Sequence, residues 1–251
     1  MRFCVQCNAE LNASFRFCNQ CGAPTDAAAA AEQEAKYYSR FQVERGASVR
    51  LLRGKGQEGE HFSVAGGKTV GRGEADLRFN DGTLSSVHAR FEEQDGALSV
   101  KDLGSLNGVF LRISGTTTLK NNDIFRIGDH YFLFEWFDES LFKSEFQTQF
   151  FSTPRRGMKY RLVEILAGGL RGRALCAGER SIVIGRRDGD WIFSDDEYLS
   201  PRHCEIECSG DTVRIKDLGS RNGVFLRIRG EAELRNGDLL FVGDELFAVS
   251  I

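Results

Sequence analysis

The chain of 251 residues is long enough for two ordinary domains, and its hydrophobic (41%) and charged (27%) contents are those of a globular protein with a buried core. The formal net charge of −3 gives no electrostatic signal for nucleic acid or for an anionic membrane. No apolar run approaches the roughly 20 residues of a membrane span, and no apolar stretch of a secretory signal follows the first residues. We therefore expect a cytoplasmic protein without membrane contact, whose cysteines are metal ligands or buried thiols.

Two CxxC pairs with ten residues between them begin the chain, at Cys4, Cys7, Cys18 and Cys21. Each pair can aim two sulfurs at one point, and four thiolates complete the tetrahedral shell of Zn²⁺. Ordering about 20 residues costs on the order of 30 kcal/mol of conformational entropy, towards which zinc binding to such sites contributes roughly 10–16 kcal/mol.

The segment 1–25 resembles a short zinc ribbon, and we predict a structural Zn²⁺ because four cysteines leave no position open for catalysis. Two disulfides or four free thiols are the alternatives.

Two linkers are predicted. In residues 26–45, Asp26 precedes a run of strong helix formers, which favours either a helix or a frayed spacer. In residues 138–156, Phe142, Phe146 and Phe150 recur every four residues before Pro154, which indicates one apolar helical stripe. We expect this stripe to pack on the protein's own domains; a stripe offered to a partner or a membrane is the alternative.

An internal repeat dominates the rest of the chain. Residues 101–113 read KDLGSLNGVFLRI, and residues 216–228 read KDLGSRNGVFLRI. The register continues on both sides with a period of about 115 residues, so each copy is long enough to be a domain. We place the first repeat at residues 46–137 and the second repeat at residues 157–251.

Each repeat is expected to be all-β. Short alternating runs such as residues 98–103 and 131–136 are separated by Gly, Asn and Asp turn residues at intervals of 8–12 residues. This pattern is typical of a sandwich of two antiparallel sheets, with the Asp-Leu-Gly-Ser-x-Asn-Gly segment at a strand end and in a loop.

Three motifs occur in the same order in both repeats: Gly-Arg, then SxxH, then Asn-Gly. In a strand-rich domain of about 95 residues, this combination resembles the forkhead-associated (FHA) domain. The resemblance implies two 11-stranded β-sandwiches in tandem that bind phosphothreonine peptides.

A phosphothreonine carries nearly two negative charges and three acceptor oxygens. The guanidinium of Arg72 or Arg186 can present the planar donor fork that this group needs, which lysine cannot imitate. Ser85 and Ser200 are short enough to reach a phosphate oxygen from a loop held near it.

The resemblance implies the same division of labour. The Arg and Ser of the motifs are expected to contact phosphate and the Asn the peptide backbone, while the Gly and His residues shape the loops. The predicted binding residues are Arg72, Ser85, Ser86, Asn107, Arg186, Ser200, Arg202, Arg221 and Asn222. The predicted structural residues are Gly71, His88, Gly108, Gly185, His203 and Gly223.

The repeats depart from the family pattern in different ways. The residue after the motif serine often donates to phosphate, but in the second repeat it is Pro201, which has no N–H. The residue before the motif asparagine often donates too; Arg221 can do so and Leu106 cannot. We expect the second repeat to bind phosphate better, because Arg221 adds a charge and Arg202 is near. Either copy could instead bind protein surfaces without phosphate.

Catalytic alternatives are weaker. His203 and Cys204 are neighbours in a strand and point to opposite faces. Ser85 and His88 lack the nucleophile elbow of a hydrolase, and the chain has no phosphate-binding loop or dinucleotide fingerprint. We therefore expect no enzymatic activity.

The sequence predicts a phosphothreonine-binding adaptor downstream of a Ser/Thr kinase, with that kinase or its substrates as partners. The alternative is a nucleic-acid-associated regulator that uses the zinc ribbon, with the repeats as phosphate-independent surfaces. The balanced charge of residues 1–45 argues against nucleic acid as a partner.

Overall fold

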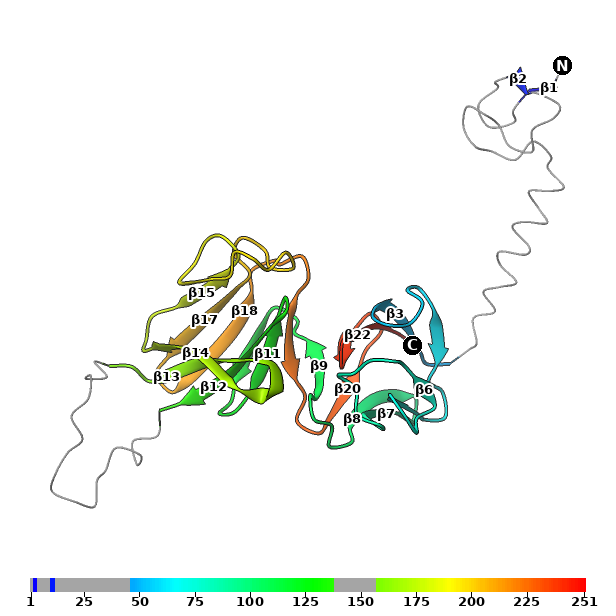
Figure 1. Cartoon of the computed structure of the whole chain (residues 1–251), viewed down its shortest axis with the longest axis horizontal. Helices are drawn as coiled ribbons and strands as arrows, with labels where there is room; N and C mark the ends of the chain where they lie inside the picture. Colours follow the sequence, from blue (N-terminus) through cyan, green and yellow to red (C-terminus); the bar gives the residue numbers. More distant parts are fainter. Residues whose placement is uncertain (1, 4–9, 12–45, 138–156) are drawn as a thin grey trace. The chain divides into compact units, whose positions relative to one another are not determined.

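The computed structural model describes residues 2–3, 10–11, 46–137 and 157–251 (Figure 1). The four predicted zinc ligands and the predicted linkers 26–45 and 138–156 lie outside the described residues. Near the N-terminus, β1 (Arg2–Phe3) pairs antiparallel with β2 (Glu10–Leu11). Ala47–Ile251 forms a separate compact unit that contains both repeats.

Both repeats are built from strands, as predicted. The first repeat contains β3 (Ser48–Arg53), β4 (His61–Ser63), β5 (Lys68–Gly71), β6 (Leu77–Arg78), β7 (Ala89–Gln94), β8 (Ala97–Asp102), β9 (Val109–Arg112), β10 (Thr116–Leu119), β11 (Ile124–Ile127) and β12 (His130–Trp136). The second contains β13 (Tyr160–Ile165), β14 (Arg171–Ala177), β15 (Ile182–Gly185), β16 (Trp191–Ile192), β17 (Cys204–Ser209), β18 (Thr212–Asp217), β19 (Val224–Arg227), β20 (Glu231–Leu234), β21 (Leu239–Val242) and β22 (Glu245–Ser250). The predicted count of eleven strands per domain is not confirmed, since β3 to β12 and β13 to β22 are ten in each repeat.

The strands of Ala47–Ile251 form two five-stranded sheets and one ten-stranded sheet. The order in the large sheet is β14-β13-β12-β11-β19-β9-β21-β22-β3-β4. Each five-stranded sheet packs against one half of the ten-stranded sheet, so there are two sandwiches that share a continuous sheet (Figure 1).

The two repeats exchange their last three strands. The strand β10 pairs with β18 of the second repeat, and β20 pairs with β8 of the first. In the large sheet, β12 pairs with β13 and β22 pairs with β3. Neither sandwich is therefore built from one repeat alone, whereas the sequence predicted one sandwich in each copy.

Short connections favour this exchange. Residues 113–115 join β9 to β10, and residues 228–230 join β19 to β20. Such a connection spans at most about 13 Å, and the two sheets of a sandwich lie about 10 Å apart. Little chain is left to turn back towards the same repeat, and short hinges promote the exchange of elements. The central strands β9 and β19 pair with each other instead, with Leu111 opposite Leu226.

Each hydrophobic core draws on both repeats. Under the first repeat's strands β3, β5, β7 and β8, the core includes Leu240 and Phe247 of the second repeat. The other core includes Phe125, Phe132 and Phe134 of the first repeat, all fully buried. Since burial of each such side chain contributes about 1.5–3 kcal/mol, the exchanged strands supply a large part of the stability of both sandwiches.

A third cluster on the opposite face of the large sheet joins the repeats. It is built on Phe110, Phe225 and Phe241. The guanidinium of Arg126, which is 3% exposed, lies 3.9 Å from the Phe241 ring centroid and 3.4 Å from the Asp244 carboxylate. Arg126 of the first repeat and Phe241 of the second occupy equivalent positions in the two repeats. The contact between the repeats, which we call the junction, therefore joins two different residue types.

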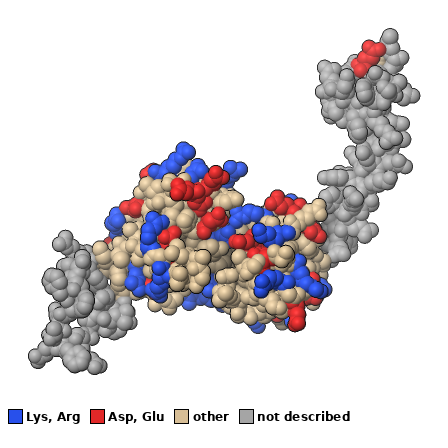
Figure 2. Space-filling model, viewed as in Figure 1, with Lys and Arg blue, Asp and Glu red and all other residues tan. Residues whose placement is uncertain are grey.

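Basic and acidic side chains are interspersed over the visible face of the unit (Figure 2). This view contains no single-sign face of the kind that a nucleic-acid backbone would need.

Candidate functional site

Three loops of the first repeat meet beside Ser85. The backbone N–H of Arg72, directly after β5, donates to the Ser85 carbonyl at 2.9 Å. The backbone N–H of Leu106, in the β8–β9 loop, donates to Ser85 Oγ at 3.3 Å. Arg72 and Leu106 are exposed and Ser85 is half-buried, so these groups line a surface rather than a cavity.

A buried histidine supports this surface from below. His88 Nδ1 accepts from the Ser85 backbone N–H at 3.2 Å, and Nε2 lies 3.1 Å from the Gly108 carbonyl, to which it donates in the neutral tautomer. Burial lowers the pKa of His88 below its ordinary value, which favours the neutral ring that both bonds need. His88 thus connects the serine loop to the Asn-Gly turn.

The exposed Asn107 is held through its amide. Its Nδ2 donates to the Thr83 carbonyl at 2.7 Å. The amide oxygen Oδ1 can then accept a hydrogen bond from a ligand. Gly108 next to it donates from its backbone to Ser105 Oγ at 2.9 Å.

Gly71 allows the arginine loop to approach the serine loop closely. A Cβ at Gly71 would overlap the backbone carbonyl of Ser86, so no other residue fits there without moving one loop. Ser86 itself is exposed, and its Oγ accepts from the Glu74 backbone at 3.3 Å.

The second repeat reproduces this arrangement. The backbone of Arg186 donates to the Ser200 carbonyl at 2.9 Å, and the backbone of Arg221 donates to Ser200 Oγ at 3.1 Å. His203 lies 3.2 Å from the Ser200 nitrogen and 3.0 Å from the Gly223 carbonyl, and its pKa is also lowered by burial.

The remaining predicted residues of this repeat are placed in the same way. Asn222 Nδ2 donates to the Tyr198 carbonyl at 2.7 Å. A Cβ at Gly185 would overlap the Pro201 carbonyl. The predicted binding residues of each repeat are therefore on loops, and Gly71 and Gly185 end the strands β5 and β15.

The two arginines differ. Arg72 is exposed, whereas Arg186 is half-buried. Among the described residues, the buried Nε of Arg186 has no hydrogen-bond partner. A buried unpaired donor on a cation is costly unless a ligand pairs with it. Arg202 is exposed and lies 3.6 Å from the Asp188 carboxylate.

Two buried aspartates that the sequence interpretation missed organise the serine loops. Asp81 accepts from the Thr83 backbone (2.8 Å) and hydroxyl (2.6 Å), and Asp196 accepts from the Tyr198 backbone at 2.7 Å. Burial alone would raise the pKa of Asp81, but the bonds from Thr83 and Asp244 hold it below its ordinary value. An Asp side chain that accepts the backbone N–H two residues later is a common turn signal, and it could have indicated both aspartates from the sequence.

The two catalytic pairs considered from the sequence, His203–Cys204 and Ser85–His88, have structural roles. Cys204 is fully buried in a core, and burial raises the pKa of its thiol. The rings of His88 and His203 face backbone groups. Within the described ranges, no helix is long and apolar enough to cross a membrane, and no group of three His, Cys, Asp or Glu side chains could hold a metal ion.

Comparisons with known proteins match these loops. The FHA domain family model matches residues 68–128 and 182–243. FhaB of Mycobacterium tuberculosis is 33% identical over 66 residues, which are 26% of this chain and 43% of FhaB. The oxoglutarate dehydrogenase inhibitor of Corynebacterium jeikeium is 31% identical over 85 residues, which are 34% of this chain and 56% of the inhibitor. The chain thus spans about half the length of these relatives.

A structure of Mycobacterium tuberculosis EmbR with a low-affinity phosphopeptide aligns with 34% of this chain and 26% of EmbR, at 30% identity and a TM-score of 0.21. The two matches to the family model coincide with the two sets of converging loops, one set around Ser85 and one around Ser200. The chain therefore carries two FHA domains, and the sequence match to each lies within one repeat.

Proposed function

We propose that this protein is a phosphothreonine-peptide-binding adaptor that acts downstream of a Ser/Thr protein kinase, without enzymatic activity of its own. Its partners are proteins phosphorylated on threonine, either the kinase or its substrates. The observation that carries the proposal is the unpaired, buried Nε of Arg186 beside the Ser200 loop. A phosphate would give this cationic donor its partner, in a charge-assisted bond.

Each residue has a distinct role in the proposed second site. The Arg186 fork and the hydroxyl of Ser200 bind phosphate oxygens, and the Arg221 side chain adds positive charge. Asn222, whose Nδ2 is held by the Tyr198 carbonyl, offers Oδ1 to an N–H of the peptide backbone. Arg202 adds charge at the border of the site. The first site uses Arg72, Ser85 and Asn107 in the same way, and Ser86 adds a donor where the second site has Pro201.

The first site is the weaker phosphate binder in this proposal. Leu106, which is 86% exposed, stands where the second site has Arg221. An exposed leucine beside the phosphate position adds no charge, but it can contact an apolar side chain of the peptide. The two sites therefore differ in the peptides they select.

Titration of the full chain with a phosphothreonine peptide tests this function. Micromolar affinity, about −8 kcal/mol, is expected, with none for the unphosphorylated peptide. A phosphoserine peptide lacks one methyl group worth about 0.8 kcal/mol, so it should bind about fourfold more weakly. Arg72→Ala combined with Arg186→Ala should abolish binding, whereas the exposed Arg90→Ala serves as a matched control. Unchanged binding in the double variant would refute the proposal.

We also propose that Cys4, Cys7, Cys18 and Cys21 hold a structural Zn²⁺. The proposal is supported by the four-thiolate donor set and by the antiparallel pairing of Phe3 with Glu10, residues that precede and follow the first CxxC pair in the sequence. Elemental analysis of protein purified without added metal should give one zinc per chain. A chelator should then remove order only before about residue 25. Zinc-free protein with intact disulfides would contradict this.

A further inference from the structure

We infer that each phosphopeptide site is positioned by the opposite repeat: the β11–β12 turn of the first repeat holds the second site, and the β21–β22 turn of the second repeat holds the first. This inference rests on the proposed function for the identity of the sites. It rests on the strand exchange for the contacts that pass from one repeat to the site of the other.

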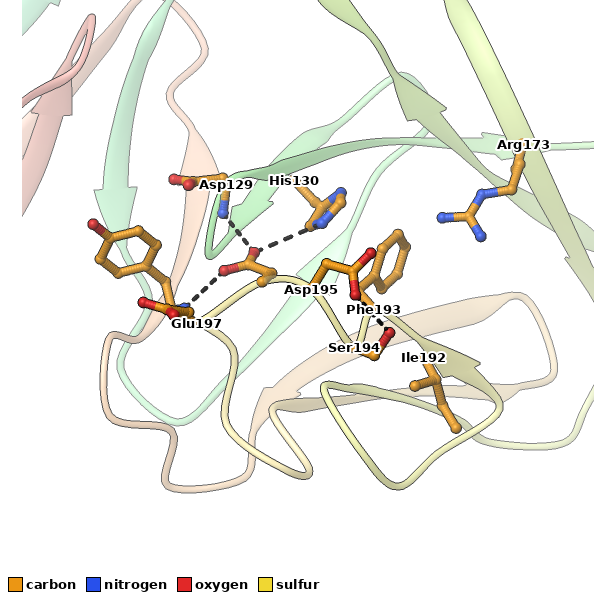
Figure 3. Close-up of a pocket in the computed structure, with 10 residues that line it drawn as sticks. Asp129, His130, Arg173, Ile192, Phe193, Ser194, Asp195 and Glu197 are labelled. Carbon is orange, nitrogen blue, oxygen red and sulfur yellow. Dashed lines mark hydrogen bonds and ion pairs between the residues drawn. The ribbon is translucent and has the colours of Figure 1, made fainter.

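In the second site, Asp196 is the link. Its Oδ2 accepts the backbone N–H of Asp129, from the first repeat, at 2.9 Å. Its Oδ1 accepts the backbone N–H of Tyr198 at 2.7 Å, and the Tyr198 carbonyl holds Asn222. Figure 3 shows the turn with Asp129 and His130, in green, facing the loop of the second repeat, in yellow. Three successive hydrogen bonds thus run from the first repeat to the proposed peptide-binding asparagine.

His130 reinforces this link. Its Nε2 lies 3.7 Å from Asp196 Oδ2, and its Nδ1 lies 3.0 Å from Glu164 Oε1 in β13. The buried Asp196 carboxylate therefore faces two residues of the first repeat and one of its own.

The first site has the reciprocal arrangement. The backbone N–H of Asp244, from the second repeat, lies 2.9 Å from Asp81 Oδ2 and 3.0 Å from Thr83 Oγ1. The Thr83 carbonyl accepts from Asn107 Nδ2. The same path is thus present in both directions.

A second contact crosses at each site. A Cβ on Gly108, in the first site, would overlap Arg227 of the second repeat, and a Cβ on Gly223 would overlap Arg112 of the first. These arginines are on β9 and β19, which pair with each other. Both Asn-Gly turns therefore rest on a side chain from the other repeat.

Two glycines allow the contacts between the repeats to be tested. Gly128 (φ 54°) is so close to Asp196 that a Cβ there would overlap its carboxylate. At Gly243 (φ 62°), a Cβ would lie 2.7 Å from Thr83 Oγ1 and 2.8 Å from Asp81 Oδ2. A side chain at either position must displace the loop of the opposite repeat.

The experiment measures one site at a time in the full chain, with a phosphothreonine peptide. Arg72→Ala leaves only the second site, and Arg186→Ala leaves only the first. Gly128→Val should weaken binding at least tenfold in the Arg72→Ala background and less than twofold in the Arg186→Ala background. Gly243→Val should do the reverse. Gly128→Ala and Gly243→Ala serve as milder variants if valine prevents folding.

Matched controls separate the effect of the contact between repeats from the effect of backbone strain at a glycine with positive φ. Gly96 (φ 80°) and Gly210 (φ 59°) also have positive φ, but a Cβ at either would have open space. Gly96→Val and Gly210→Val should leave both sites within twofold. If Gly128→Val weakens the first site instead of the second, each repeat closes its own sandwich and the inference is wrong.

A second measurement does not depend on peptide binding. A protease recognition sequence inserted between residues 137 and 157 allows the repeats to be cut apart after folding. With three strands exchanged in each direction, the two fragments should elute together in dilute gel filtration until a denaturant is added. Elution as two folded fragments would overturn the exchange. Absent peptide binding with co-eluting fragments would refute the proposed function alone.

Discussion

At the scale of single residues, the two sites differ most at one position. Leu106 and Arg221 occupy equivalent places, and the backbone N–H of each donates to the motif serine. Their side chains are exposed, so exchanging them should leave the loop geometry unchanged while altering the charge beside the phosphate.

Leu106→Arg should strengthen phosphopeptide binding at the first site, measured in the Arg186→Ala background. An exposed charge contributes about 0.2–1 kcal/mol, which corresponds to up to about a fivefold gain that declines as salt rises. Arg221→Leu in the Arg72→Ala background should cause the matching loss. A gain that does not depend on salt would show that the contact is not electrostatic.

At the scale of elements, each site depends on a buried histidine that joins two loops. His88 connects the β6–β7 loop to the β8–β9 loop, and His203 does the same between β16–β17 and β18–β19. Because burial lowers the pKa of both rings, protons bind the unfolded chain more readily than the folded one.

Stability should therefore fall as the pH drops below about 6.5, the ordinary pKa of histidine, and level off once the folded rings are protonated too. Above that value both rings are neutral in either state, so their contribution is constant. Thermal unfolding measured from pH 8 to pH 5 tests this. In His88→Asn combined with His203→Asn the slope should decrease, and an unchanged slope would contradict the assignment.

At the scale of the whole molecule, the exchange makes the two repeats dependent on each other. An isolated repeat lacks the partner strands and should exchange them with a second copy of itself. The junction would then pair Arg126 with Arg126 in a dimer of the first repeat, and Phe241 with Phe241 in a dimer of the second. The contact of Arg126 with the Phe241 ring would be lost, and like charges would be brought together in a buried place.

We therefore expect residues 157–251 alone to form a more stable dimer than residues 46–137 alone. Sedimentation and thermal unfolding of both fragments test this, and Arg126→Phe should stabilise the dimer of the first repeat. Stable monomers of either fragment would contradict the exchange. Equal stability of the two dimers would show that the Arg126–Phe241 pair does not direct the pairing.

Much of this protein is determined by local sequence. The alternation of apolar residues and the Gly and Asn turns predicted the all-β fold, since strand faces and turn conformations depend on residues close in the chain. The Gly-Arg, SxxH and Asn-Gly motifs led to the loops that meet at Ser85 and Ser200 because each motif serves the same local geometry in both repeats.

Only the tertiary structure decided which strands complete which sandwich, and hence that Asp129 supports the second site and Asp244 the first. Residues 101–113 and 216–228 differ at one position, so the local pattern of either repeat fits the partner strands of both. The choice depends on the short connections at residues 113–115 and 228–230, which leave little chain to turn back. It also depends on the contact of Arg126 with Phe241, two residues far apart in the sequence. Asp81 and Asp196 follow the same rule: their bonds to Thr83 and Tyr198 are local, but the bonds that they accept from Asp244 and Asp129 come from the opposite repeat and depend on the tertiary structure.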